Sequence, residues 1–228
     1  DEGAPPVRRP GNRDGAAVQP ARLVRGLARA VERHGGRIVE QTAVTDYAGG
    51  GKPVLRTERG DVRARRAIVL AGEAYLSQLR KLRRHVIPMT SHMVVTEPLS
   101  PEIWAKIGWD RREVLGGFGT TGGYIQHTAD GRIAFGAYRA RYPYNSKITD
   151  DLDRMEDIFE HARIAARTWF PDLRETAFTH AWGGVFGAPR DHMPTMGFNP
   201  RTGVALAYGY TGEGVATSNL SGRVLTDL

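Results

Sequence analysis

Apolar side chains recur every three or four positions in several stretches of the chain, which is the period of an amphipathic helix. The clearest stretch begins at Pro20, which suits a first helical turn, and stops at the glycine pair 35–36. A second stretch runs over residues 150–170 and is ended by Pro171. The same period predicts helices over residues 73–82 and from Glu213 onward.

Shorter segments between these helices are rich in β-branched and apolar residues. They predict strands over residues 37–40, 42–47, 54–57, 62–64, 66–72, 85–99, 122–138, 177–187 and 204–208. Turn residues 58–61 and 129–131 indicate two hairpins, and the continuous apolar run 66–72 is typical of a buried parallel strand. The sequence therefore predicts an α/β domain interrupted by an α+β insertion with a mainly antiparallel sheet.

The change of pattern along the chain predicts four segments. Residues 1–19 are rich in Gly, Pro and Arg and are expected to be irregular. Residues 20–82 form the first part of the α/β domain, residues 83–180 form the insertion, and residues 181–228 return to the α/β domain.

Composition narrows the classes of protein. The 228 residues are 40% hydrophobic and 25% charged, as in globular proteins, and contain no apolar run of membrane-spanning length and no signal peptide. Cysteine is absent, which excludes disulfides, thiolate nucleophiles and cysteine-ligated zinc and fits the cytoplasm. We expect no metal site. The net charge of +7 is compatible with a nucleic-acid partner. The basic residues are scattered and lack interleaved aromatic residues, however, so a solvated basic face is favoured.

A glycine-rich turn joins the last predicted strand to the last helix. Gly209, Gly212 and Gly214 permit positive φ and close approach of a ligand, and the following helix directs free N–H groups toward it. Such a turn suits an anion, or it simply joins a strand to a helix. A pyrophosphate-binding βα unit would need a following strand and an acidic ribose partner, which the sequence up to Leu228 does not supply.

Six segments occur in register: VQPARLVRGLARAVERHGGRIVEQTAVTDY, RARRAIVLAGEAYLSQL, VIPMTSHMVVTEPL, ADGRIAFGAYR, HAWGGVFGAPRDHMPTMG and ALAYGYTGEGVATSNLSGRVLTDL. Together they resemble the FAD-dependent oxidoreductases of the D-amino acid oxidase superfamily, in the branch of γ-glutamylputrescine oxidase-like enzymes. The resemblance covers residues 17–228. It implies that residues 20–82 and 181–228 are parts of a GR2-like FAD-binding domain and that residues 83–180 bind the substrate.

The resemblance also assigns roles to residues. It implies cofactor contacts at Val44, Ala71, Gly72, Tyr75, Gly184, Gly209, Tyr210, Thr211, Gly212, Glu213, Gly214 and Val215. The glycine turn would face the pyrimidine edge of the flavin, where negative charge gathers on reduction. Tyr124 and Tyr138 would orient the substrate. The alternatives are core packing for Val44 and Tyr75 and sheet packing for the two hairpin tyrosines.

The implied reaction is hydride transfer from an amine to FAD, followed by hydrolysis of the imine and reoxidation by oxygen or another acceptor. FAD would be non-covalent, or linked through residues outside this segment. The resemblance implies that relatives which oxidise α-amino acids carry an arginine just after a W-x-G turn. The corresponding stretch here, Trp182-Gly183-Gly184-Val185-Phe186, has no arginine, so a small-molecule amine or polyamine is favoured. Arg139 and Arg190 are the alternative carboxylate partners. The oligomeric state is left open.

The family places a G-x-G-x-x-G unit ahead of the segment that begins at residue 17, and this sequence lacks it. We therefore expect the chain to be part of a longer enzyme. The alternative is a truncated, non-catalytic relative that acts as a subunit or a binding module.

Overall fold

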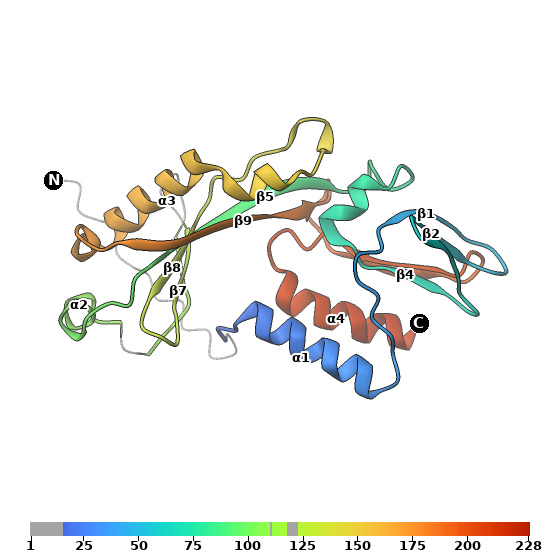
Figure 1. The fold of residues 1–228 in the computed structure, drawn as a ribbon, viewed down its shortest axis with the longest axis horizontal. Coiled ribbons are helices and arrows are strands. Elements are labelled where there is room, and N and C mark those ends of the chain that lie inside the picture. Colours follow the sequence, from blue (N-terminus) through green and yellow to red (C-terminus); the bar gives the residue numbers. More distant parts are fainter. Residues whose placement is uncertain (1–15, 110, 118–122) are drawn as a thin grey trace. The chain divides into compact units, whose positions relative to one another are not determined.

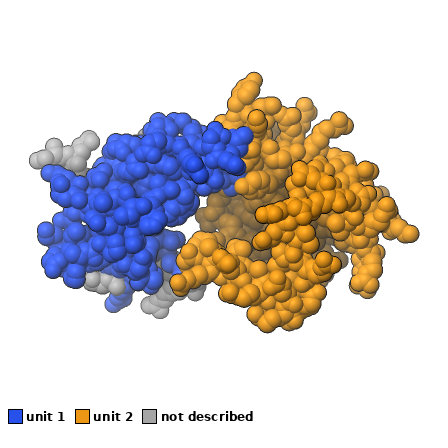
Figure 2. Space-filling view, in the orientation of Figure 1, with its two compact units in different colours: residues 1–17, 90–141, 149–185 blue, residues 18–89, 142–148, 186–228 orange. Residues whose placement is uncertain are grey.

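The computed structural model describes residues 16–109, 111–117 and 123–228, and the chain forms two compact units (Figures 1 and 2). Unit 1 comprises residues 1–17, 90–141 and 149–185, and unit 2 comprises residues 18–89, 142–148 and 186–228. No helix within the described residues is long and apolar enough to cross a membrane. The predicted irregular segment 1–19 lies largely outside the described residues.

A three-stranded sheet of unit 2 carries the glycine-rich turn. Its order is β10 (Thr195–Asn199), β11 (Val204–Tyr208) and β4 (Ile68–Leu70), with β4 parallel to β11 and β10 antiparallel to it. Helix α4 (Gly214–Asp227) packs against β10 and β11 (Figure 1). The predicted parallel pairing is confirmed. The strand is buried on one face only, because Ile68 and Leu70 are buried and Val69 between them is 54% exposed.

The second sheet of unit 2 is antiparallel and consists of β1 (Val44–Ala48), β2 (Val54–Thr57) and β3 (Gly60–Arg63). Its predicted hairpin is confirmed, with Gly60 at φ 123°. Residues 37–40, predicted as a strand, are irregular, so that prediction was wrong. Ile38 and Val39 are exposed and no strand of the described chain pairs with them, and a β-branched run needs such a partner.

Two helical segments of unit 2 precede β5 in the sequence. Helix α1 (Pro20–Arg33) has the predicted proline at its start, and the Gln19 side chain caps it by accepting the amide of Arg22 at 2.6 Å. Its apolar residues stay exposed, with Val24 at 64%. The segment that follows β4 is a 3₁₀ helix, η1 (Glu73–Gln78), instead of the predicted α-helix.

Unit 1 is built on an antiparallel sheet whose order is β6-β7-β8-β5-β9 (Figure 1). The strands are β5 (Ile87–Thr96), β6 (Leu115–Gly116), β7 (Gly123–His127), β8 (Ile133–Ala137) and β9 (Phe178–Ala188). The predicted β7-β8 hairpin is confirmed, with Gly131 at φ 75° in its turn. The last residues of β9 and the first of β5 belong to unit 2.

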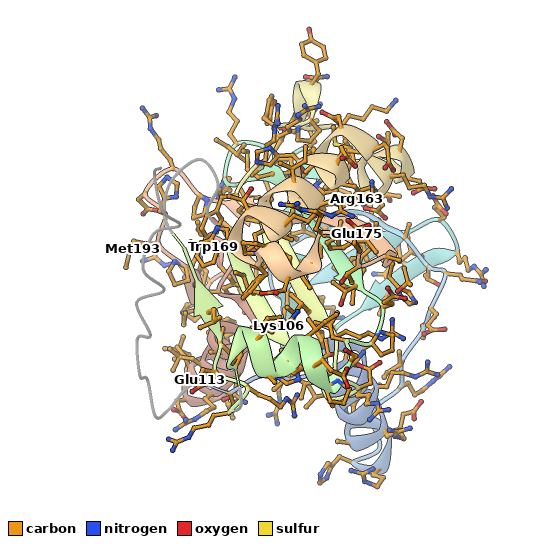
Figure 3. The ribbon with its side chains drawn as sticks, turned by 90° about the vertical axis from the view of Figure 1, so that its left-hand side faces the viewer. Lys106, Glu113, Arg163, Trp169, Glu175 and Met193 are labelled. Atoms are coloured by element: carbon orange, nitrogen blue, oxygen red, sulfur yellow. The ribbon has the colours of Figure 1, made fainter. Side chains whose placement is uncertain are left out.

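The core of unit 1 lies between this sheet and helix α3 (Glu156–Trp169). The helix buries Ile158, Phe159, Ala162, Ala165 and Ala166. All of these except Ile158 form one core cluster with buried residues of the hairpin, Ile125, Ile133 and Phe135. Arg163 and Trp169 lie on the same helix (Figure 3), and Arg163 pairs with Glu156 and Glu160. The predicted helix 150–170 is thus divided, because residues 150–154 form a separate 3₁₀ turn, η3.

Three further elements complete the described chain. Helix α2 (Pro101–Ile107) is capped by Ser100, and η2 (Tyr144–Ser146) and η4 (Pro171–Leu173) are single 3₁₀ turns. Helix α2 and strand β10 were not predicted, since one is only seven residues long and the other lacks an apolar run.

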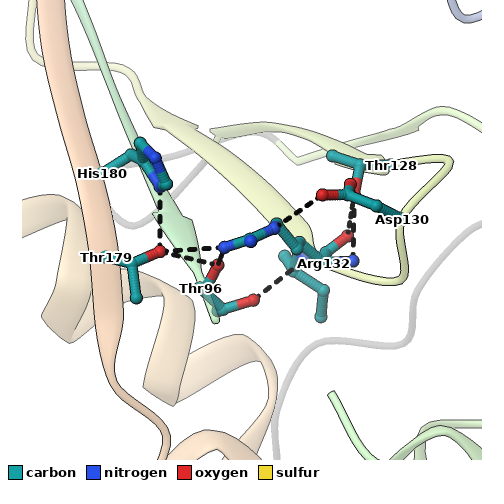
Figure 4. A network of polar contacts seen from close by, with 7 residues as sticks. Thr96, Thr128, Asp130, Arg132, Thr179 and His180 are labelled. Atoms are coloured by element: carbon teal, nitrogen blue, oxygen red, sulfur yellow. Dashed lines mark hydrogen bonds and ion pairs between the residues drawn. The ribbon is translucent and has the colours of Figure 1, made fainter. Parts of the chain in front are cut away.

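A polar network joins three strands of unit 1 (Figure 4). Arg132 donates from Nη1 to the Thr96 carbonyl and to Thr179 Oγ1, each at 3.0 Å, and its Nε pairs with Asp130 at 2.8 Å. The Thr128 hydroxyl donates to Asp130 at 2.7 Å. This bond and the Arg132 contact lower the pKa of the Asp130 carboxyl. The network fixes the hairpin turn against β5 and β9.

The folding stability of unit 1 depends on pH through His127. Its ring stacks on Trp104 with centroids 3.7 Å apart, and burial, followed by the charge of Arg112, lowers its pKa below 6.5. A histidine with a depressed folded-state pKa binds its proton less readily in the native state, so its stabilising contribution is present above about pH 6.5 and is lost as the pH falls through the folded value.

We therefore expect the unfolding temperature to fall as the pH is lowered from about 7.5 to 5.5, and the substitution His127→Gln to reduce this dependence. Thermal unfolding followed by circular dichroism at several pH values measures it. His34→Gln, at an exposed helix end, is the control and should keep the wild-type slope. An unchanged slope in His127→Gln would contradict the assignment.

Candidate cofactor site

The glycine-rich turn follows β11 and leads into α4. Gly209, Thr211 and Gly212 have φ values of 79°, 50° and 94°, the left-handed region that favours glycine. Thr211 donates its amide to the carbonyl of Gly187 at 3.2 Å, and the amide of Glu213 reaches the Tyr210 carbonyl at 2.9 Å. The turn is therefore closed by its own backbone and by the end of β9.

The start of α4 leaves amides available. Thr217 donates to the Glu213 carbonyl at 3.2 Å, and Glu213 makes no side-chain cap. Within the described part of the chain, the amides of Gly212, Gly214, Val215 and Ala216 have no hydrogen-bond acceptor in the backbone. A helix N-terminus with open amides carries a partial positive charge. A Cβ added at Gly212 would meet no atom within 4 Å, so space is open there.

Glu73 ties this turn to two other segments of unit 2. Its Oε1 accepts the amides of Gly209 at 3.0 Å and Tyr210 at 2.9 Å, and its Oε2 accepts the amide of Gly187. The amides of Gly209 and Tyr210, both expected at the cofactor, thus bind this carboxylate. Sequence reasoning missed Glu73, although it stands directly between the expected contacts Gly72 and Tyr75.

The other predicted contacts of unit 2 lie at the ends of two strands. Ala71 and Gly72 follow β4, and a Cβ at Gly72 would approach Leu76 Cδ2 to 3.0 Å, so internal packing also favours glycine there. Tyr75 is 61% exposed in this chain. Val44 begins β1, in the other sheet of unit 2, and is exposed. Glu73 holds the turn after β4 (Ala71 and Gly72) next to the glycine-rich turn. Val44 lies in the separate β1-β2-β3 sheet.

A cavity of about 360 Å³ opens beside Thr211 of the turn. Its lining comes from the start of β5, the end of β9 and the segment after it: Ile87, Met89, Phe186, Ala188, Pro189, Arg190, His192 and Thr211. Five of these residues are apolar, and Arg190 and His192 supply cationic or polar groups. Arg190, one of the predicted carboxylate partners, therefore lines this cavity together with Phe186.

The predicted substrate residues Tyr124 and Tyr138 belong to unit 1. The Tyr124 hydroxyl lies 2.6 Å from Ser91 Oγ and donates to the His92 carbonyl at 3.3 Å. Burial raises its pKa, against the effect of the Ser91 bond. Its ring lies 5.9 Å from that of Tyr138, which is 53% exposed.

Gly184, an expected cofactor contact, lies in β9 and has open space where a Cβ would stand.

The geometry of unit 2 fits a flavin. The open amides suit an anionic edge, the glycines allow close approach, and the neighbouring cavity suits an apolar ring. These features occur within one unit and are held together by the backbone contacts of Glu73 and Gly187.

Comparison with known proteins agrees with this geometry. The family model described as FAD dependent oxidoreductase (DAO) matches residues 11–228. The chain is 30% identical over 219 residues to gamma-glutamylputrescine oxidoreductase of Escherichia coli (strain K12), covering 94% of this chain and 48% of that protein. It is 31% identical over 217 residues to "Probable oxidoreductase OrdL" of Rhizobium meliloti (strain 1021), covering 92% of this chain and 46% of that protein.

Solved structures share the fold. Glycine oxidase from Geobacillus kaustophilus matches with a TM-score of 0.73 at 23% identity, over 90% of this chain and 52% of that one. L-proline dehydrogenase from P. horikoshii matches with a TM-score of 0.69 at 17% identity, over 86% and 51%. These matches confirm the mixed α/β fold with a mainly antiparallel sheet. The chain spans about half the length of the curated relatives it matches. Because the family model covers almost all of it, the chain belongs to the DAO family of FAD dependent oxidoreductases.

Proposed function

We propose that this chain carries the flavin-ring site and the substrate-binding sheet of an enzyme that oxidises the C–N bond of an amine. FAD, when bound, supplies the hydride acceptor. The observation that supports the proposal most directly is the set of open amides at the start of α4, beside the apolar cavity at Thr211. In this proposal the cofactor contacts Val44, the turn after β4 (Ala71 and Gly72) and residues 209–215. Residues 83–180 form the substrate-binding domain.

The chain's own contribution is electrostatic and steric. The amides of Gly212, Gly214 and Val215 would stabilise negative charge as it gathers on the bound cofactor during reduction. The apolar walls of the cavity would exclude water from the reacting carbon. No side chain is needed as an obligatory base if the amine arrives deprotonated. In this proposal Tyr124 and Tyr138 would orient the amine through their rings.

The lining of the cavity supports an amine substrate over an α-amino acid. Phe186 and the other apolar lining residues offer a carboxylate no cationic partner, and a carboxylate left unpaired in an apolar site is costly. One relative is named as an oxidoreductase of gamma-glutamylputrescine, which supports an amine of the polyamine type. Arg190 lines the same cavity, so an acidic group elsewhere on the substrate remains compatible with it.

The test uses the natural polypeptide that contains this chain, at its full length. We expect it to bind FAD and, without oxygen, to be bleached by amines such as putrescine derivatives faster than by α-amino acids. Flavin absorbance measures both steps, and readmission of oxygen shows whether oxygen is the acceptor. Bleaching by α-amino acids alone would overturn the substrate class. A colourless protein that takes up no FAD would favour the non-catalytic alternative.

A further inference from the structure

Glu73 stands at a point where three segments of unit 2 meet. It begins η1 directly after β4, while its carboxylate receives amides from the end of β9 and from the glycine-rich turn. The partners lie 114 to 137 positions away along the sequence. No other described side chain accepts the amides of Gly209 and Tyr210. The carboxylate therefore connects all three segments, in addition to the backbone bond from the Thr211 amide to the Gly187 carbonyl.

The backbone around Glu73 is adapted to this contact. Glu73 has φ 48°, a conformation that is unfavourable for a residue with a Cβ. Gly187 is required on the other side, because a Cβ there would lie 2.7 Å from Glu73 Oε2 and 2.5 Å from Val86 Cγ2. Strain at one position and the absence of a side chain at the other both serve to bring the carboxylate to the amides.

Three amide donors match a carboxylate better than other side chains. Its two oxygens offer about four lone-pair sites and donate nothing, so they accept three N–H groups without conflict. A glutamine amide in the same place would direct an NH₂ group at one of the amide donors. A glycine would remove the acceptor and relax the positive φ at the same time.

We propose that Glu73 is the positioning residue of the flavin site. By holding the amides of Gly209 and Tyr210, it fixes the turn so that the next amides, at Gly212 and the start of α4, stay directed at the cofactor. It also places a negative charge beside the turn, which opposes the arrival of further negative charge on the reduced cofactor. The inference rests on the proposed function, because it concerns the same FAD site.

The experiment compares Glu73→Gln and Glu73→Gly with the wild type in the full-length polypeptide. Glu58→Gln is the matched control, since Glu58 is exposed in the β2-β3 turn of the same unit. We expect both Glu73 variants to bind FAD about ten- to a hundredfold more weakly, the loss of one or two strong hydrogen bonds. We also expect a more positive flavin reduction potential in Glu73→Gln, because the negative charge is gone. A purely structural role would not predict that sign.

A second readout needs no cofactor. In the cofactor-free protein, the amide proton resonances of Gly187, Gly209 and Tyr210 should move upfield in both variants, as charge-assisted hydrogen bonds are lost. Glu58→Gln should leave them in place. Gly187→Ala displaces the same carboxylate from the opposite side and should weaken FAD binding in the same way.

The outcomes separate this inference from the proposed function. A wild type that takes up no FAD overturns both. A wild type that binds FAD, with Glu73 variants of equal affinity and unchanged potential, overturns the role of Glu73 alone. Unmoved amide resonances overturn it as well. Weaker binding together with a more positive potential supports it, and circular dichroism shows that each variant is folded.

Discussion

Replacing Gly209 by alanine is expected to lower the free energy of unfolding by about 2 to 4 kcal/mol and to remove FAD binding. The residue has φ 79°, which costs an L-residue about 1 to 2 kcal/mol. The added Cβ would also lie 2.9 Å from Pro189 Cγ, closer than packed carbon atoms allow. Any shift that relieves this contact moves the amide that Glu73 accepts at 3.0 Å. Urea denaturation and FAD titration measure the two effects.

Gly222→Ala is the matched control for this substitution. Gly222 lies in α4, and a Cβ there meets no atom within 4 Å. Alanine in the interior of a helix is favoured over glycine by about 0.5 to 1 kcal/mol, so this variant should be slightly more stable and bind FAD normally. A Gly209→Ala protein with wild-type stability and affinity would show that the turn does not need its left-handed residue.

Truncating Phe135 to alanine is expected to destabilise the protein by about 3 to 5 kcal/mol. Phe135 is fully buried in β8, packs in the core with Ile125 and α3, and meets the Trp169 ring edge-on at 6.4 Å. Removing the ring loses its transfer free energy and leaves a cavity that a sheet and a helix cannot close. The change in midpoint of urea denaturation at constant slope gives the value.

The comparison for Phe135 is Ile164→Ala on the outer side of α3. Ile164 is 56% exposed, so its truncation should cost about 0.5 kcal/mol or less. Because Phe135 and Tyr124 lie on the same hairpin, the core substitution should also loosen the strand that carries Tyr124. A decrease in the free energy of unfolding below about 1 kcal/mol in Phe135→Ala would mean that neighbouring side chains fill the cavity.

Elements with strong local signals were predicted correctly. The proline start of α1, the two hairpins and the apolar strand β4 depend on turn glycines, helix caps and periodicity, which act over a few residues. Weak local signals failed. The apolar residues Ile38 and Val39 predicted a strand that has no pairing partner, and the short elements α2 and β10 were missed.

The candidate site divides in the same way. The sequence predicted the glycine-rich turn and the open start of the helix, and the resemblance implied a flavin as their ligand. The sequence did not show that the amides of Gly209 and Tyr210 are hydrogen-bonded to Glu73, because this acceptor lies more than 130 positions away. It also did not place Phe186 and Arg190 in one cavity with Thr211, since that depends on how β5, β9 and the turn meet.

The sequence by itself determined the family, the order of the main elements and the turn that favours a ligand, because each of these is written in local residue patterns. The tertiary structure alone decided which amides of the turn remain free, what lines the neighbouring cavity and that Glu73 holds both strand ends to the turn. Those features depend on hydrogen bonds between distant segments, and a polar side chain such as Glu73 carries no local sign of which distant amides it will meet.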